Sequence, residues 1–184
     1  MENHKNFLQE ILIDENRLQS RIAELGTAIS NDYKDSKDLL LICILRGAII
    51  FLADLSRQIT IPHAMDFMAI SSYGSGTRSS SGVVRINMDL TTNISGKDVL
   101  IVEDIIDSGN TLAYVLELLS TRKPKSMRVC TLLDKFERRE VDIPIRYTGF
   151  KIPDKFVFGY GLDLDEIYRN LPFIGVVDPE KYDS

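Results

Sequence analysis

The sequence has few of the features that define several large classes of protein. Its 184 residues include two cysteines, Cys43 and Cys130, and contain no Cys-x-x-Cys pair or histidine-rich stretch of the kind that forms zinc sites. Each cysteine lies within an apolar run, so we expect both to be small buried hydrophobic residues. The longest apolar run, residues 39–45, is far shorter than the roughly 20 residues that cross a bilayer. We therefore expect neither a structural zinc site nor a membrane partner.

The sequence also lacks the markers of secretion and of nucleic-acid binding. The N-terminal region mixes charged residues such as Glu2 and Lys5 with short apolar pieces, without the continuous apolar stretch of a secretory signal. The chain carries 22 basic and 27 acidic residues, a net charge of −5, and its densest basic pair, Arg138-Arg139, is flanked by acids. Because nucleic-acid binding depends on clustered basic residues, we expect no nucleic-acid partner. Because a secretory signal is lacking, we expect a cytoplasmic protein.

The length and the pattern of apolar runs predict one α/β domain over residues 1–184. Helical spacing over residues 14–33 and 48–59, and a helical stretch from about 110 to 121, alternate with short apolar runs typical of buried strands. The expected strands are residues 39–45, 65–70, 83–90, 98–102, 127–133, 146–150, 155–158 and 173–177. Buried strands that alternate with helices favour a mainly parallel sheet with helices on both faces.

One segment of the chain differs from all the others in composition. Of the twelve residues from 71 to 82, nine are serine or glycine. Such a loop is too long for a tight hairpin and too polar to bury, and long loops inside compact domains are usually lids or binding loops. The alternative is a passive surface insert.

Polar residues follow the ends of several predicted strands. In an open parallel sheet the ligand lies beyond the carboxyl ends of the strands, so these residues are the candidates for a site. They are Arg46-Gly47, Ser72-Tyr73, residues 103–111, Lys135 and residues 156–163.

The richest of these segments is residues 103–111. Asp107 to Thr111 supply hydroxyl groups, a glycine and free backbone N–H groups at the start of a helix, which together can hold an anion. The acids Glu103 and Asp104 would repel a phosphate, so they more plausibly bind a sugar diol or a Mg²⁺ ion. Phosphate, diol and metal together indicate a phosphorylated ribose. The alternative is an ordinary strand-to-helix turn in which Asp107 or Ser108 is the N-cap.

Residues 99–111, VLIVEDIIDSGNT, closely resemble the phosphoribosyl-diphosphate signature of the type I phosphoribosyltransferases. Other segments resemble the hypoxanthine and hypoxanthine-guanine branch of that family, and the likeness runs from about residue 11 to residue 178. These segments are Leu45-Arg46-Gly47, Ser72-Tyr73, Leu133-Asp134-Lys135, residues 152–163 (IPDKFVFGYGLD), and Arg169.

The resemblance implies a fold and a reaction. The fold would be a mainly parallel sheet flanked by helices, with a small hood subdomain and a mobile Ser/Gly lid beginning at Ser72 and Tyr73. The reaction would transfer 5-phosphoribosyl from phosphoribosyl diphosphate to N9 of hypoxanthine or guanine, giving IMP or GMP and diphosphate. Such a transfer needs no covalent nucleophile, and the sequence has no Gly-x-Ser-x-Gly motif. A homodimer or homotetramer is also implied.

The resemblance further implies roles for individual residues. Glu103 and Asp104 would bind the ribose hydroxyls, directly or through Mg²⁺, and Asp163 would be a further metal ligand. Ser108, Gly109, Asn110 and Thr111 would hold the 5′-phosphate, and Arg46, Gly47 and Arg169 the diphosphate. Many relatives have lysine where this chain has Arg46, and both are cations. Asp107 would act as the base that accepts the proton of purine N7.

The resemblance assigns the purine pocket to Lys135, Phe156, Val157, Asp163 and Ile105. Lys135 would donate to the O6 carbonyl of an oxopurine, where adenine carries an amino group. Phe156 would stack on the base. Taken alone, Lys135 could be an ordinary surface lysine, Phe156 a core residue and Asp163 a turn acid.

Two other functions deserve comparison with this one. A regulator on the same fold could sense phosphoribosyl diphosphate while binding RNA or DNA, but it should show a basic face or an added DNA-binding domain. A phospho-receiver domain also places an acid pair and a lysine at strand ends, but it has no use for residues 71–82 or 152–163.

Overall fold

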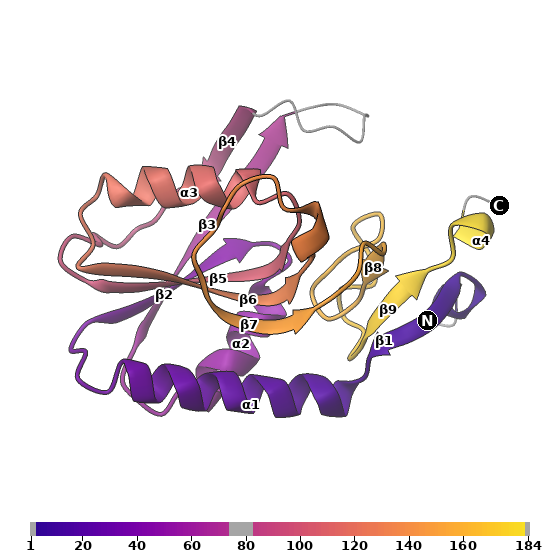
Figure 1. Cartoon of the computed structure of the whole chain (residues 1–184), viewed down its shortest axis with the longest axis horizontal. Helices are drawn as coiled ribbons and strands as arrows, with labels where there is room; N and C mark the ends of the chain where they lie inside the picture. The colour runs from indigo at the N-terminus through magenta and orange to yellow at the C-terminus, as the bar shows by residue number, and fades with distance from the viewer. Residues whose placement is uncertain (1–2, 74–82, 183–184) are drawn as a thin grey trace.

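The computed structural model describes residues 3–73 and 83–182, and it contains two β-sheets (Figure 1). The larger sheet has six strands in the order β4-β3-β2-β5-β6-β7, and all neighbours are parallel except the antiparallel pair β3 and β4. In that order the strands are β4 (Val83–Met88), β3 (Ala64–Tyr73), β2 (Leu39–Leu45), β5 (Asp98–Ile106), β6 (Ser126–Asp134) and β7 (Ile145–Lys151).

Helices cover both faces of this sheet, as the alternation of elements predicted. Helices α1 (Glu15–Asp32) and α2 (Ile49–Gln58) lie on one face, and α3 (Asn110–Ser120) lies on the other (Figure 1). Consecutive residues of β2 point to opposite faces, so Leu41 and Cys43 pack with α1 and α2 while Leu40 and Ile42 pack with α3. Cys43 and Cys130 are buried and unpaired, as expected.

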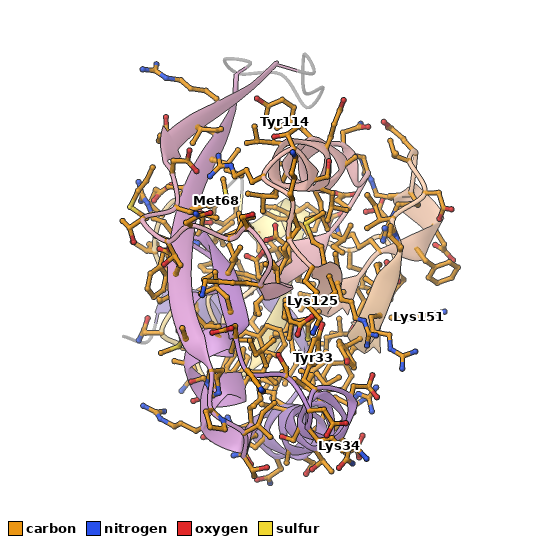
Figure 2. All side chains as sticks on the ribbon, turned by 90° about the vertical axis from the view of Figure 1, so that its left-hand side faces the viewer. Tyr33, Lys34, Met68, Tyr114, Lys125 and Lys151 are labelled. Atoms are coloured by element: carbon orange, nitrogen blue, oxygen red, sulfur yellow. The ribbon has the colours of Figure 1, made fainter. Side chains whose placement is uncertain are left out.

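The two layers of side chains are clearest when the molecule is seen from the end of the sheet (Figure 2). Tyr114 on α3 and Lys34, just after α1, mark opposite sides of the molecule, and side chains fill the space between each helix and the sheet. Among the helices of the described residues, none is long and apolar enough to cross a membrane.

A second, antiparallel sheet forms the small hood that the family resemblance implies. Its strands are β1 (Leu8–Ile13), β9 (Ile174–Val177) and β8 (Val157–Phe158), in the order β1-β9-β8. It lies beside the carboxyl ends of the parallel strands (Figure 1), with its own small core around Phe7 and Phe158. Three short helical turns complete the chain: η1 (Asn3–Asn6), η2 (Phe136–Arg138) and α4 (Pro179–Tyr182).

Three expectations about the elements need correction. Strand β1 was not predicted, because the adjacent polar residues Gln9 and Glu10 leave only three consecutive apolar residues in it, and because it is completed by β9 from the other end of the chain. Strand β5 continues to Ile106, beyond the expected end at residue 102, since Glu103 still pairs with Thr131 of β6.

The third correction concerns the Ser/Gly segment. Its first three residues are not loop: Ser71 to Tyr73 belong to β3, where they pair with β4 from Arg85 to Val83. An antiparallel pair at the edge of a sheet satisfies their backbone groups and accepts polar side chains. The remaining residues of the predicted lid, 74–82, lie outside the described residues.

Candidate active site

The predicted phosphate cradle lies at the junction of β5 and α3. A cavity of about 170 Å³ is lined there by Glu103, Ile105, Ile106, Asp107, Ser108, Gly109, Thr111 and Leu112. Gly109 is the N-cap of α3 with a φ of 89°, a conformation that favours glycine. Gly109 has no side chain to cap the helix, but the Ser108 hydroxyl accepts from the backbone N–H of Asn110 at 3.4 Å. The N-cap position itself is therefore occupied by neither Asp107 nor Ser108. The unpaired backbone N–H groups of α3 can therefore serve a bound anion.

The predicted cradle residue Asn110 has a different surrounding. Its side-chain amide donates to Glu140 at 2.7 Å, and Asn110 is not among the residues that line the cavity. The backbone N–H of Glu140 donates in turn to the Ser108 carbonyl at 2.9 Å. The backbone N–H of Asn110 donates to the Ser108 hydroxyl at 3.4 Å. Asn110 thus ties the turn to the segment after η2.

Glu103 and Asp104 are adjacent acids near the end of β5. Burial, followed by the neighbouring Asp104, raises the pKa of Glu103 well above its usual value, and its Oε2 atom is buried without a hydrogen-bond partner. Burial also raises the pKa of Asp104 to about 6, although a hydrogen bond from the backbone N–H of Ile105 acts against that rise. An acid pair with raised pKa values and an unused oxygen is suited to bind hydroxyl groups or a cation.

Gly47 brings the diphosphate loop against this acid pair. It follows β2, whose last residue is joined to Arg46 by a cis peptide bond. A Cβ atom added at Gly47 would lie 1.5 Å from Oδ2 of Asp104, and one added at Gly161 would lie 2.0 Å from the Gly47 carbonyl oxygen. Glycine at position 47 lets the loop lie this close to Asp104 of β5, and glycine at position 161 lets the segment after β8 lie this close to the loop.

A second cavity contains every residue predicted for the purine pocket. Its volume is about 280 Å³, and it is lined by Asp104, Ile105, Asp107, Lys135, Phe156, Val157, Leu162 and Asp163. These residues come from β5, the end of β6 and the segment around β8, so the cavity lies where the sheet meets the hood. Leu162 is the one lining residue that the sequence did not single out.

Two ordinary interpretations of pocket residues are wrong. Lys135 is not a surface lysine, since only 7% of it is exposed, and Phe156 is not a core residue, since 60% of it is exposed. The Lys135 ammonium donates to Asp154 at 3.3 Å and lies 4.0 Å from Asp107. A buried ammonium beside an exposed aromatic ring is a suitable arrangement for a flat base with a carbonyl group.

Arginines and acids alternate at the predicted diphosphate site. Glu166 forms ion pairs with both Arg46 and Arg169, and Arg169 also pairs with Asp163 at 2.9 Å. Arg169 further donates to the Gly161 carbonyl at 2.8 Å. The two predicted diphosphate-binding cations thus share one carboxylate, which the sequence analysis did not single out.

The predicted metal ligands do not form a ready-made metal site. No group of three or more acids, histidines or cysteines in the described part of the chain is arranged to hold a metal ion. Asp163 is instead occupied by Arg169 and by the backbone N–H of Glu166. A cation bound here would need oxygen atoms from the substrate as well.

The sequence did not indicate a functional role for three residues that lie at the site: Arg138, Asp154 and Glu166. Arg138 pairs with Asp107 at 2.8 Å and with Asp154 at 3.1 Å. Asp154 lies within the IPDKF segment, but nothing in the sequence shows that its carboxylate faces Lys135 and Arg138. Only the packing of η2 against the segment before β8 reveals this.

The comparisons with known proteins agree with the geometry of the site. A model of the phosphoribosyl transferase domain matches residues 9–166. The hypoxanthine phosphoribosyltransferase of Escherichia coli strain K12 is 56% identical over 169 residues, covering 91% of this chain and 94% of that protein. The chain belongs to the phosphoribosyltransferase family.

Other similar proteins refine this membership. The hypoxanthine-guanine phosphoribosyltransferase of Mycobacterium avium is 54% identical over 180 residues, covering 95% of this chain and 88% of that protein. The crystal structure of a hypoxanthine phosphoribosyltransferase from Staphylococcus aureus superposes with a TM-score of 0.93 at 46% identity, covering 99% of this chain and 97% of that one. This phosphoribosyltransferase is therefore an enzyme of purine salvage, with the fold that the resemblance implied. The regulator and receiver alternatives gain no support.

Proposed function

We propose that this phosphoribosyltransferase moves the 5-phosphoribosyl group of phosphoribosyl diphosphate to N9 of hypoxanthine, guanine or both, releasing diphosphate and giving IMP or GMP. The observation that carries the proposal is the 280 Å³ cavity, which gathers Lys135, Phe156, Val157, Asp163 and Ile105 around one space. The names of the similar proteins from E. coli and M. avium support the same choice of bases. Residues 1–184 would act as a single domain.

The sugar phosphate would occupy the space next to this cavity. Ser108, Gly109 and Thr111 line the smaller cavity and would hold the 5′-phosphate with the start of α3, together with the backbone of Asn110. Glu103 and Asp104 would accept hydrogen bonds from the ribose hydroxyls. Asp107 and Ile105 line both cavities. The ribose would therefore lie between the phosphate and the base.

The departing diphosphate would bind on the side of Arg46, Gly47 and Arg169. Both arginines now pair with Glu166, so diphosphate would compete with that carboxylate for them. Gly47 leaves room for its backbone to approach the ligand, because a larger residue would displace Asp104. Planar guanidinium groups suit oxygen-rich phosphate groups, which donate nothing and accept several hydrogen bonds.

The purine would be held and activated by three residues. Lys135 would donate to O6, Phe156 would stack on the ring, and Asp107 would take the proton from N7 as N9 bonds to the anomeric carbon. A positioned general base contributes roughly 10²–10⁴-fold to a rate. Adenine would be excluded because its amino group would face the Lys135 donor.

Mg²⁺ would complete the site with the substrate. The buried, unpartnered Oε2 of Glu103 and the raised pKa of Asp104 show an acid pair that suits a cation, with Asp163 as a further candidate ligand. When bound, the ion would neutralise charge on the diphosphate leaving group.

The remaining parts of the proposal concern surroundings and gating. We propose that the enzyme works in the cytoplasm as a homodimer or homotetramer, without nucleic-acid or membrane partners. Ser72 and Tyr73, at the end of β3, would begin a lid that excludes water from the activated sugar.

Assays of the purified protein with phosphoribosyl diphosphate, Mg²⁺ and each of hypoxanthine, guanine, xanthine and adenine test the proposal. We expect nucleotide formation with hypoxanthine, guanine or both, and none with adenine. The proposal would be contradicted if adenine were converted at the rate of the oxopurines, or if none of the bases were converted. Xanthine reports on discrimination at purine C2.

A further inference from the structure

Four charged side chains form a closed ring beside the proposed purine cavity. Arg138 Nε lies 2.8 Å from Asp107 Oδ1, and Arg138 Nη1 lies 3.1 Å from Asp154 Oδ2. Lys135 Nζ lies 3.3 Å from Asp154 Oδ1 and 4.0 Å from Asp107 Oδ2, which closes the ring. Two cations alternate with two carboxylates, so the ring is neutral as a whole.

The members of this ring divide into an inner and an outer pair. Asp107 and Lys135 line the cavity, whereas Arg138 and Asp154 are not lining residues and each contacts one member of the inner pair. The inner side chains come from the end of β5 and the end of β6, and the outer ones from η2 and the segment before β8. The outer pair therefore joins separate segments behind the two groups that face the base.

The contact between Lys135 and Asp107 is the longest of the four contacts in the ring. A charged lysine and a carboxylate in direct contact lie about 2.7–2.9 Å apart, and the other three links are all shorter than the one between Lys135 and Asp107. Arg138 pairs with the Asp107 carboxylate, and Asp154 pairs with the Lys135 ammonium. Without these outer contacts, the attraction between opposite charges would bring Lys135 and Asp107 together.

An oxopurine needs these two groups close but not joined. Its O6 and N7 lie side by side on one edge, O6 as an acceptor for an ammonium and N7 as the site that gives up its proton to a carboxylate. We propose that Arg138 and Asp154 are positioning residues that keep Lys135 and Asp107 apart, so that this edge of the base can insert between them. The inference rests on the proposed function, because it assigns the cavity to an oxopurine.

The variants Arg138→Gln and Asp154→Asn test it through the two Michaelis constants. When either outer residue is lost, Lys135 and Asp107 can pair, and the base must break that pair before it binds. We expect the KM for hypoxanthine to rise about 10-fold, the effect of one moderately strong charged contact, while the KM for phosphoribosyl diphosphate changes less than about 2-fold. Arg138→Lys keeps a cation on Asp107 and should recover part of the loss.

The controls separate positioning from general damage. Arg57→Gln removes an exposed arginine on α2 that pairs with Asp54, and it should leave both constants unchanged. Arg138 is about half exposed, so its replacement should lower the melting temperature by no more than about 2 °C. If Asp154→Asn does not fold, the Arg138→Gln variant alone tests the inference.

Two results would overturn the inference. Parental constants in Arg138→Gln would show that the inner pair needs no support. An equal rise in both constants would show a loss of structure rather than of spacing. If the parent enzyme fails to turn over any oxopurine, the proposed function itself is rejected, which is a distinct outcome.

Discussion

At the scale of single residues, Asp107 combines a catalytic assignment with an unusual set of contacts. It lines both cavities and is paired with Arg138, while the N-cap position of α3 is occupied by Gly109. The variant Asp107→Asn keeps the shape of the side chain and removes the proton acceptor. We expect the single-turnover rate to fall by roughly 10²-fold or more, with phosphoribosyl-diphosphate affinity little changed.

Rapid-quench kinetics and direct binding measurements on this one variant check both halves of the expectation. Ser108, Gly109 and Thr111, which we propose hold the 5′-phosphate, are unchanged in this variant, which is why affinity should survive. An unimpaired rate would remove Asp107 from the mechanism.

Glu166 is the second residue whose importance is visible only in three dimensions. Its carboxylate pairs with Arg46 and Arg169, the two cations that would bind diphosphate. Glu166→Gln frees both arginines from a competing negative charge. We expect inorganic diphosphate to bind roughly 3–10-fold more tightly by calorimetry, the effect expected of a solvent-exposed charged pair.

The exposed Glu117 on α3 provides a matched control, because Glu117→Gln removes the same charge without touching either arginine. In a background that also carries Arg46→Gln, the gain from Glu166→Gln should shrink. Unchanged or weaker diphosphate binding in Glu166→Gln would show that its carboxylate does not compete with the ligand.

At the scale of elements, Asp98 joins the beginning of β5 to its neighbours. Its carboxylate accepts hydrogen bonds from Ser36 at 2.7 Å, Ser126 at 2.7 Å and Lys125 at 3.0 Å. Burial alone would raise the pKa of Asp98, but these hydrogen bonds outweigh it and hold the pKa below its usual value. The carboxylate therefore stabilises the fold above its ordinary pKa, and that stabilisation is lost as the pH falls through the lower pKa of the folded state.

This direction of the pKa shift predicts how the variant Asp98→Asn changes stability. We expect its free energy of unfolding at pH 7 to be lower by about 1–3 kcal/mol. Its difference from the parent should shrink as the pH falls below about 4, because the carboxyl of the unfolded chain becomes protonated there and that of the folded protein at a lower pH. Urea titrations between pH 7 and pH 3 measure both. Asp38→Asn, which removes an exposed carboxylate 3.8 Å from Lys97, should show little change at either pH. A constant difference across the whole pH range would contradict the role given to the charge.

At the scale of the whole molecule, we expect catalysis to depend on a metal ion and folding not to depend on one. Two hydrophobic cores, one on each face of the six-stranded sheet, form without any metal ligand. The acid pair of Glu103 and Asp104, by contrast, has a buried oxygen without a hydrogen-bond partner, and we propose that it binds a cation together with the substrate. We expect activity to require Mg²⁺ or Mn²⁺, while excess chelator leaves the melting temperature within about 2 °C of the untreated protein.

Activity assays and thermal unfolding in the presence of EDTA check the two halves together. Full turnover in excess chelator would refute the metal requirement. Unfolding by the chelator would instead make the metal part of the folded structure.

The local sequence determined most of the elements and the family. The apolar run of β2, the helical spacing of α1 and the motif from β5 into α3 depend on neighbouring residues, so they can be identified without the fold. The resemblance of continuous segments to the family also assigned five residues to a purine pocket, and all five line one cavity.

Only the tertiary structure decided the features that need distant partners. Strand β1 exists because β9, from the opposite end of the chain, supplies its hydrogen bonds. Ser71 to Tyr73 are strand because β4 returns beside them. The closeness of Arg46 to Glu166, and of Arg138 to Asp107 and Asp154, depends on how the hood and η2 pack against the sheet. Charge pairs carry no sequence pattern at such separations, because a side chain is attracted by what lies near it in space, whatever its position along the chain.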